Sequence, residues 1–415
     1  DEQVTNLFQR KLAVDAFVGA LGGGLLAALA LLVLGGGASA LAGTFAELFV
    51  GRLGPKTRVP EFTGSFNVSF AELTGETFRN SPYTYDLVYV RKGTFFTGFV
   101  KAVRRAELAT IRARYAAEAT GAEGVKSNAG RTTANTSSWS VLLPFDLPFR
   151  RTEYVNTDGG LRWSSEFSQQ VPPAGDDWPE WISGSVRPLT RLRAGTTYRQ
   201  EWNRAVFAPS VAGDIDAAVR AGDLIVVGLP LFSEGSGNLG WSVTDTARVA
   251  LFSGDTLIGE NADQYGEFEV PPAEAPYRLE VSATRGAPFR LSTSVSATWT
   301  FRSATGDARL PLSTVRFSPR LDDRNTAPAG RAFDVPLTVE RQKHSAATRT
   351  RVLAAEVSYD DGQTWRAAAV RGSGDHRIAR VSHPAGAGFV SLRVNATDTA
   401  GHTVTQTVIR AYAIG

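Results

Sequence analysis

Hydrophobic and polar residues alternate along much of the chain after residue 52. The alternation is clearest in four runs, which cover residues 277–283, 295–302, 333–339 and 390–396. A period of two places successive side chains on opposite faces of a strand. Turn residues separate the runs, so the pattern predicts half-buried antiparallel strands that stack face to face as β-sandwiches.

One segment has a different period. Apolar side chains recur at spacings of three and four in Leu108, Ile111, Tyr115 and Ala119, and the nearby arginines lie largely off this stripe. Such spacing predicts an amphipathic helix over 103–120. Its basic side is interpreted as a solvated face.

The N-terminal segment lacks charge between Asp15 and Glu47 and is most apolar over 25–34. We expect an apolar helix here, with three interpretations. It could be a secretory signal with its cleavage site at 38–40, a membrane-spanning helix over 16–34, or a buried Ala/Gly-rich helix. The first two place the rest of the chain outside the cytoplasm, at the cell surface or in the extracellular space.

A length of 415 residues suggests about three domains. The predicted class is mainly β, with two to three antiparallel sandwiches of the immunoglobulin/fibronectin-like or jelly-roll-like kind. The expected division is an N-terminal apolar segment at 1–52, a β domain with the helix at 53–150, a β-sandwich at 151–305 and an immunoglobulin-like domain at 306–415.

Composition excludes several kinds of chemistry. The chain has no Cys, which removes thiolate catalysis and cysteine-based metal clusters. Its four His residues all lie at or after His344, so a His-dependent site could exist only near the C-terminus. Lys and Arg number 44 against 41 Asp and Glu, and this balance argues against a nucleic-acid partner.

Two motifs are interpreted as turns. Residues 235–240 match GxGxxG, but a strand-like run follows instead of the helix that a dinucleotide site needs, so we expect a Gly-rich hairpin loop. The second matches SxDxGxTW, the Asp-box pattern, in which side-chain oxygens tie together a tight turn above a tryptophan. Its residues are Ser358, Asp360, Gly362, Thr364 and Trp365.

Two loops are candidates for binding. Asp176 and Asp177 adjoin Trp178 and Trp181, which could form a carbohydrate or peptide platform or fold back onto a sandwich. An oxygen-rich loop at 322–325, with Asp322, Asp323 and Asn325, could hold calcium, although no twelve-residue calcium loop is present and a plain loop is favoured. No other cofactor is expected.

A series of longer stretches carries a resemblance to a known family. They include SPYTYDLVY (81–89), RTEYVNTDGGLRW (151–163), TYRQEWNRAVFAP (197–209), LPLFSEGSGNLGWSVTDTA (229–247), VSATWTFRS (295–303) and GFVSLRVNATDTAGHTVTQTVIRAYAI (388–414). In their order along residues 60–415 they resemble the accessory β-sandwich region that follows the peptidase domain in secreted actinobacterial subtilisin-like serine peptidases.

The family's catalytic residues have no counterparts here. No HGT or GTSMA motif occurs and no His precedes His344, so no catalytic residue is assigned. The resemblance implies a non-catalytic extracellular accessory region, with a peptidase domain in cis or in trans or a cell-surface polymer as partner. The alternative is a membrane-tethered adhesin or carbohydrate-binding protein. A hydrolase that uses carboxylates alone stays open, with no pair singled out.

Overall fold

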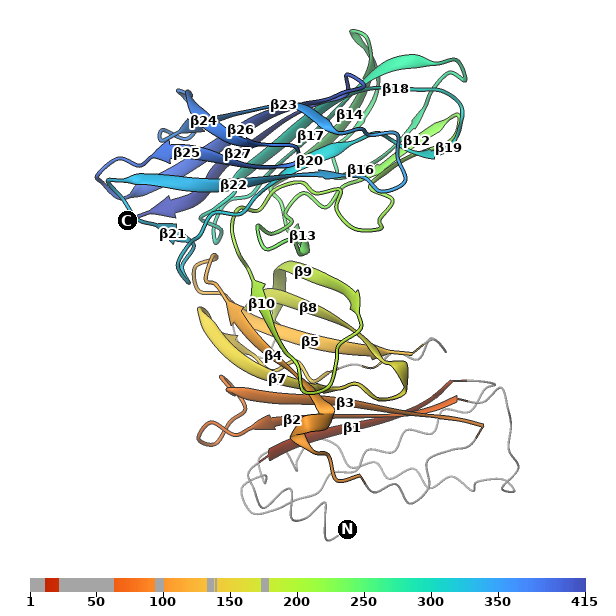
Figure 1. Ribbon diagram of the computed structural model, residues 1–415, viewed down its shortest axis with the longest axis vertical. Helices are drawn as coiled ribbons and strands as arrows, with labels where there is room; N and C mark the ends of the chain where they lie inside the picture. Colours follow the sequence, from red (N-terminus) through yellow and green to blue (C-terminus); the bar gives the residue numbers. More distant parts are fainter. Residues whose placement is uncertain (1–11, 22–62, 94–100, 133–137, 139, 173–178) are drawn as a thin grey trace. The chain divides into compact units, whose positions relative to one another are not determined.

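The computed structural model describes residues 12–21, 63–93, 101–132, 138, 140–172 and 179–415. In this part of the chain almost all regular structure is β-strand (Figure 1). The helical segments described are two single 3₁₀ turns, η1 Arg105–Glu107 and η2 Asp158–Gly160. The prediction of a mainly β protein is therefore confirmed.

The described residues form two compact units whose segments interleave along the chain. The first unit lies within Asp1–Tyr115, Glu123–Ser168 and Val186–Glu201, and the second within Ala116–Ala122, Gln169–Ser185 and Trp202–Gly415. The expected boundary between residues 150 and 151 falls inside strand β7, which pairs with two other strands of the first unit. The expected boundary after residue 305 lies between two strands of the second unit.

The larger sheet of the first unit has the strand order β1-β2-β3-β7-β4-β10. A smaller sheet has the order β13-β9-β8-β5-β6, in which β5 and β6 belong to the first unit, β13 belongs to the second, and β8 and β9 each contain residues of both. Most neighbours are antiparallel, but β3 and β7 run parallel. The strands are β1 Leu12–Leu21, β2 Thr63–Glu72, β3 Tyr83–Lys92, β4 Leu108–Tyr115, β5 Glu123–Arg131, β6 Phe145–Asp146, β7 Phe149–Asn156, β8 Arg162–Val171, β9 Glu180–Thr190, β10 Thr197–Trp202 and β13 Leu239–Ser242.

A twelve-stranded sheet dominates the second unit, with the order β15-β14-β17-β18-β27-β26-β23-β24-β25-β22-β20 and β21 beside β27 (Figure 1). Its strands are β14 Thr246–Ser253, β15 Thr256–Asn261, β17 Ala275–Thr284, β18 Ser294–Ser303, β20 Ser313–Phe317, β21 Thr326–Ala327, β22 Ala332–Arg341, β23 Thr350–Ser358, β24 Arg366–Ser373, β25 His376–Ser382, β26 Gly388–Asp398 and β27 Thr403–Ile414.

This sheet returns on itself and encloses the core. Gln406 on β27 hydrogen-bonds both the N–H and the C=O of Val315 on β20, although these strands lie far apart in the strand order. A four-stranded sheet, β16-β12-β11-β19, completes the unit. Its strands are β11 Ala218–Gly222, β12 Leu224–Gly228, β16 Tyr265–Glu269 and β19 Gly306–Arg309.

The four alternating runs are strands, as predicted. They lie in β17, β18, β22 and β26. In β18 the side chains of Val295, Ala297, Trp299 and Phe301 are buried, and the residues between them are more exposed. These apolar faces join one continuous core that runs from Ala205 to Ile414.

The predicted helix over 103–120 is wrong. Its central part is strand β4, which pairs antiparallel with β7. Ala109, Ile111, Ala113 and Tyr115 alternate inward, and Arg112 between them is exposed. Alanine favours helices and is small enough to be buried in either a helix or a strand. The same residues therefore fit the spacing of a helix as well as the period of two of a strand. Pairing with β7 decides for the strand.

The N-terminal apolar helix is also not found where the structure describes the segment. Leu12–Leu21 is strand β1, paired antiparallel with β2. The remainder of the predicted helix, with residues 22–34, lies outside the described residues. Within the described ranges, no helix is both long and apolar enough to cross a bilayer.

Candidate ligand-binding groove

A groove of about 450 Å³ lies on the outer face of the larger sheet of the first unit. Strand alternation explains its lining, because the residues of one face project together while their neighbours point into the interior. The lining residues are Glu72, Tyr83, Tyr85, Arg105, Thr110, Arg112, Thr152, Tyr154 and Thr197.

Strand register arranges these side chains in two cross-strand rows. In one row Tyr85 of β3 lies beside Tyr154 of β7, which lies beside Thr110 of β4. The second row joins Tyr83, Thr152 and Arg112 in the same way. Three neighbouring strands therefore present two rows to one surface. The row with Tyr85 and Tyr154 is called the aromatic row, and the row with Tyr83, Thr152 and Arg112 is called the mixed row.

The aromatic row is rigid. The rings of Tyr85 and Tyr154 stack with their centroids 4.7 Å apart, and the Arg105 guanidinium lies 5.7 Å from the centre of the Tyr154 ring. Burial raises the pKa of Tyr85, so its phenol stays neutral over the physiological range. Leu87 and Leu108 pack with Tyr154 on the same face of the sheet, beside the groove.

The mixed row is open to solvent. Tyr83 is 41% exposed and Arg112 is also exposed. Within the described ranges neither Arg105 nor Arg112 forms an ion pair. A tyrosine face, two unpaired guanidinium groups and three threonine hydroxyls can bind a ligand that carries both hydroxyl and carboxylate groups.

The predicted aromatic platform is only partly described. Asp176, Asp177 and Trp178 lie outside the described residues. Trp181 is on β9 in the second unit and is 42% exposed. The structure therefore does not bring these four side chains together in one described site.

The Asp-box-like residues are joined by hydrogen bonds within one turn. Ser358 Oγ donates to Asp360 Oδ1 at 2.7 Å, and the N–H of Gly362 donates to Ser358 Oγ at 2.9 Å. Asp360 also accepts hydrogen bonds from the N–H and the hydroxyl of Thr364, and the first of these is 2.9 Å long. The hydrogen bonds from Thr364 and Ser358 lower the pKa of Asp360 to about 2. Trp365 lies 4.0 Å from the Arg393 guanidinium.

The oxygen-rich loop uses its side chains internally. Asp322 Oδ1 accepts the N–H groups of Arg324 and Thr326, each at 2.8 Å. Asp323 pairs with Arg204 at 2.8 Å. Asn325 is buried, and its amide bonds backbone groups, among them the N–H of Ala205. These oxygens serve the turn and its neighbours, and the described residues contain no cluster of three or more acidic or histidine ligands.

His383 and His376 make local contacts within the second unit. His383 lies 3.0 Å from the Tyr412 hydroxyl and 2.8 Å from the Pro328 carbonyl, but Tyr412 is buried. His376 lies 3.3 Å from Thr338 on an exposed strand face. Neither lines the groove.

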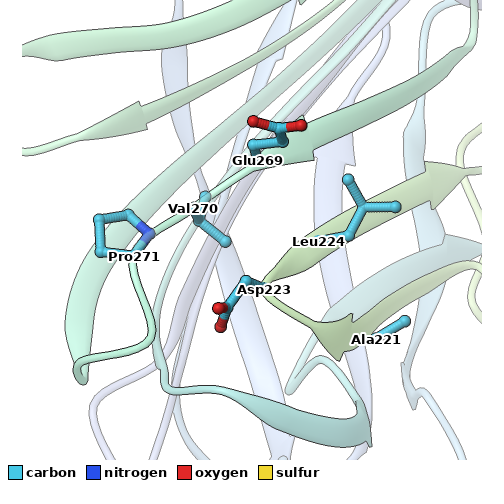
Figure 2. A pocket seen from close by; sticks show the side chains of 6 residues that line it. All are labelled: Ala221, Asp223, Leu224, Glu269, Val270 and Pro271. Carbon is cyan, nitrogen blue, oxygen red and sulfur yellow. The ribbon is translucent and has the colours of Figure 1, made fainter.

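A second hollow, of about 550 Å³, lies in the second unit. It is lined by Ala221, Asp223, Leu224, Glu269, Val270 and Pro271. Figure 2 shows that the carboxylates of Asp223 and Glu269 point in different directions and do not converge on one point. The buried Arg220 supports the turn through hydrogen bonds to the carbonyls of Gly222 and Pro271. We therefore interpret this hollow as a structural feature of the hairpin.

The groove was not anticipated as a site. Alternation of Tyr83 and Tyr85 with Thr84 and Asp86 was visible in the sequence and would have identified a two-faced strand. The parallel pairing of β3 with β7, which completes the aromatic row, has no local signal.

Comparison with known proteins adds little to this picture. No family model and no curated protein matches the chain. Among solved structures, the crystal structure of chicken CNTN1 FN1–FN3 domains aligns with 73% of this chain and 99% of its own, at 12% identity and a TM-score of 0.16. A similarity this weak assigns no fold family and carries no argument about function.

Proposed function

We propose that this chain is a non-catalytic extracellular region that binds an anionic polysaccharide through the groove on β3, β7 and β4. The observation that carries the proposal is that Arg105 and Arg112, which have no ion-pair partner among the described residues, line the same groove as the exposed ring of Tyr83.

A uronic-acid chain matches this chemistry. Sugar rings stack on an exposed aromatic face, and their carboxylates accept paired hydrogen bonds from a guanidinium group. The hydroxyls of Thr110, Thr152 and Thr197 supply further donors and acceptors for sugar hydroxyls.

In this proposal the region accompanies a subtilisin-like peptidase, in cis or in trans, and holds it near a polymeric substrate or surface. The ordered resemblance over residues 60–415 supports that role. A surface adhesin that uses the same groove is the second candidate, and it differs only in having no peptidase partner.

Calorimetric titration of the full chain tests the proposal. Oligogalacturonate is expected to bind, and a neutral cello-oligosaccharide of equal length more weakly. Tyr83→Ala and Arg112→Gln should each weaken binding about tenfold, equivalent to about 1.4 kcal/mol. Tyr265→Ala and Arg351→Gln, which alter exposed residues of the second unit, are matched controls.

Unchanged affinity in both groove variants would overturn the proposal. Preferential binding of a poly-glutamate peptide would also overturn it, because the groove would then recognise an acidic polypeptide.

A further inference from the structure

The interior of the first unit contains a buried amine, a carboxamide and two carboxylates. Lys126 and Asn128 lie on β5, Asp86 on β3 and Glu153 on β7. All four are at most 5% exposed, and Lys126 is one of only six lysines in the chain. Burying charge is costly unless every group has a partner, so such a cluster calls for a chemical explanation.

The contacts converge on the side-chain amide of Asn128. Lys126 Nζ lies 3.1 Å from Asn128 Oδ1, and Ser165 Oγ donates to the same oxygen at 2.7 Å. Asn128 Nδ2 donates to Glu153 Oε2 and to Asp86 Oδ2, each at 2.9 Å. Lys126 also forms an ion pair with Glu153.

We propose that Lys126 and Asn128 condense into an intramolecular isopeptide bond, with Glu153 as the proton acceptor and donor. Lys126 and Asn128 project to the same side of β5 because they are two residues apart. The amine and the side-chain amide therefore lie side by side on one strand face, with Nζ within hydrogen-bond distance of Oδ1.

The reaction balances without an outside reagent. Glu153 takes one proton from the Lys126 ammonium, and the resulting amine nitrogen bonds to Cγ of Asn128. A second proton moves from this nitrogen to Nδ2 through Glu153 or Asp86, and the Cγ–Nδ2 bond breaks. The products are a secondary amide and ammonia, which leaves as ammonium with the first proton.

The surroundings support each step. The Ser165 hydroxyl is placed to stabilise negative charge on Oδ1 as the amine attacks. Burial lowers the pKa of Lys126 and raises that of Asp86, which favours a neutral amine and a protonated carboxyl. Tyr115, Phe145 and Phe167 pack together as an aromatic cluster in the same interior, and Tyr115 hydrogen-bonds Glu153.

Mass spectrometry of the intact full chain gives a direct test. The wild-type protein is expected to be lighter than its sequence mass by one ammonia. Trypsin should fail to cleave after Lys126, so residues 115–131 should remain in one peptide. Tandem spectra of this peptide should place the new bond between Lys126 and Asn128.

Variants distinguish formation of this isopeptide bond from other reactions that release ammonia. Lys126→Arg and Glu153→Gln should each have the full mass calculated from their sequences. Asn128→Asp should form the same bond by losing water instead of ammonia, so its mass should equal that of the wild-type protein. Lys101→Arg, at a partly exposed lysine, should keep the loss. A full wild-type mass would overturn the proposal, and so would cleavage after Lys126, which would indicate a succinimide at Asn128. A bond from Lys126 to Gln200, whose Oε1 lies 3.3 Å away, would overturn the choice of Asn128.

Discussion

The two units build their interiors in different ways. The second unit encloses one continuous apolar core, lined by β17, β18, β22, β26 and other strands. The first unit encloses the polar cluster of Lys126, Asn128, Asp86 and Glu153. Both consist of layered sheets, so layering alone does not require an apolar interior.

The difference indicates where chemistry is expected. Apolar burial stabilises a fold by roughly 25 cal/mol for each Å² removed from water and needs no special geometry. A buried charged cluster gives little net stability, and it depends on every hydrogen bond being made. The second unit is therefore interpreted as a scaffold and the first as the unit that carries function.

One buried ion pair in the second unit offers the strongest way to break this contrast. Arg285 pairs with Glu118 at 3.3 Å, and its guanidinium lies within 4.2–5.2 Å of the ring centres of Phe207, Phe232 and Phe289. Glu118→Gln leaves this cation buried without a counter-charge. We expect the free energy of unfolding to fall by about 3–5 kcal/mol, measured by urea denaturation.

Glu356→Gln is the matched control, because Glu356 pairs with Arg393 at 3.7 Å on a partly exposed surface. Its effect should stay within about 0.5 kcal/mol. If Glu118→Gln were equally mild, the second unit would not depend on this pair, and the contrast between the two interiors would be sharper than described.

The sequence identified elements wherever one face is strongly apolar. In β17 and β18 large apolar residues alternate with polar ones, so only one face of each strand is suited to burial. Both strands were therefore predicted correctly. In β4 two of the inward residues are Ala109 and Ala113, whose small side chains fit a helix as well as a strand. Only pairing with β7 resolves that ambiguity.

The polar cluster could not be predicted for a different reason. Its members come from three strands of two sheets, and Asp86 and Glu153 lie 67 positions apart in the sequence. Each residue taken alone is a polar position in an alternating run, which normally indicates a solvated face. Because the two sheets pack face to face, these polar positions lie in the interior instead of at a solvated face. The sequence carries no local signal for that packing.

Leucine truncation compares the large core of the second unit with the small apolar cluster beside the groove. Leu279 is fully buried in β17 within the large core, and Leu87 is 7% exposed in the small cluster. Leu279→Ala should cost about 3–5 kcal/mol, and Leu87→Ala about 2–3 kcal/mol, because a site near the surface relaxes more easily. Hydrogen exchange of peptides from each unit measures the two effects separately. Equal costs would mean that the small cluster beside the groove is packed as rigidly as the large core.

Acid titration gives the smallest effect and compares one carboxylate from each unit, whose pKa values shift in opposite directions. In the second unit Asp398 accepts the N–H of Thr348 at 2.8 Å and of His402 at 2.9 Å. Burial acts to raise the pKa of Asp398, but these hydrogen bonds lower it from 3.8 to about 2. In the first unit burial raises the pKa of Asp86 above 3.8.

A lowered pKa contributes stability that is lost as the pH falls through the folded-state value, and a raised pKa contributes stability that is lost as the pH rises. The advantage of the wild type over Asp398→Asn should therefore be about 2 kcal/mol near neutrality and vanish between about pH 4 and pH 2. Relative to Asp86→Asn, the wild type should instead lose stability as the pH rises above about 4. Urea denaturation of the three proteins across this range tests both signs. If both variants shifted in the same direction, the opposite pKa shifts of these two carboxylates would be contradicted.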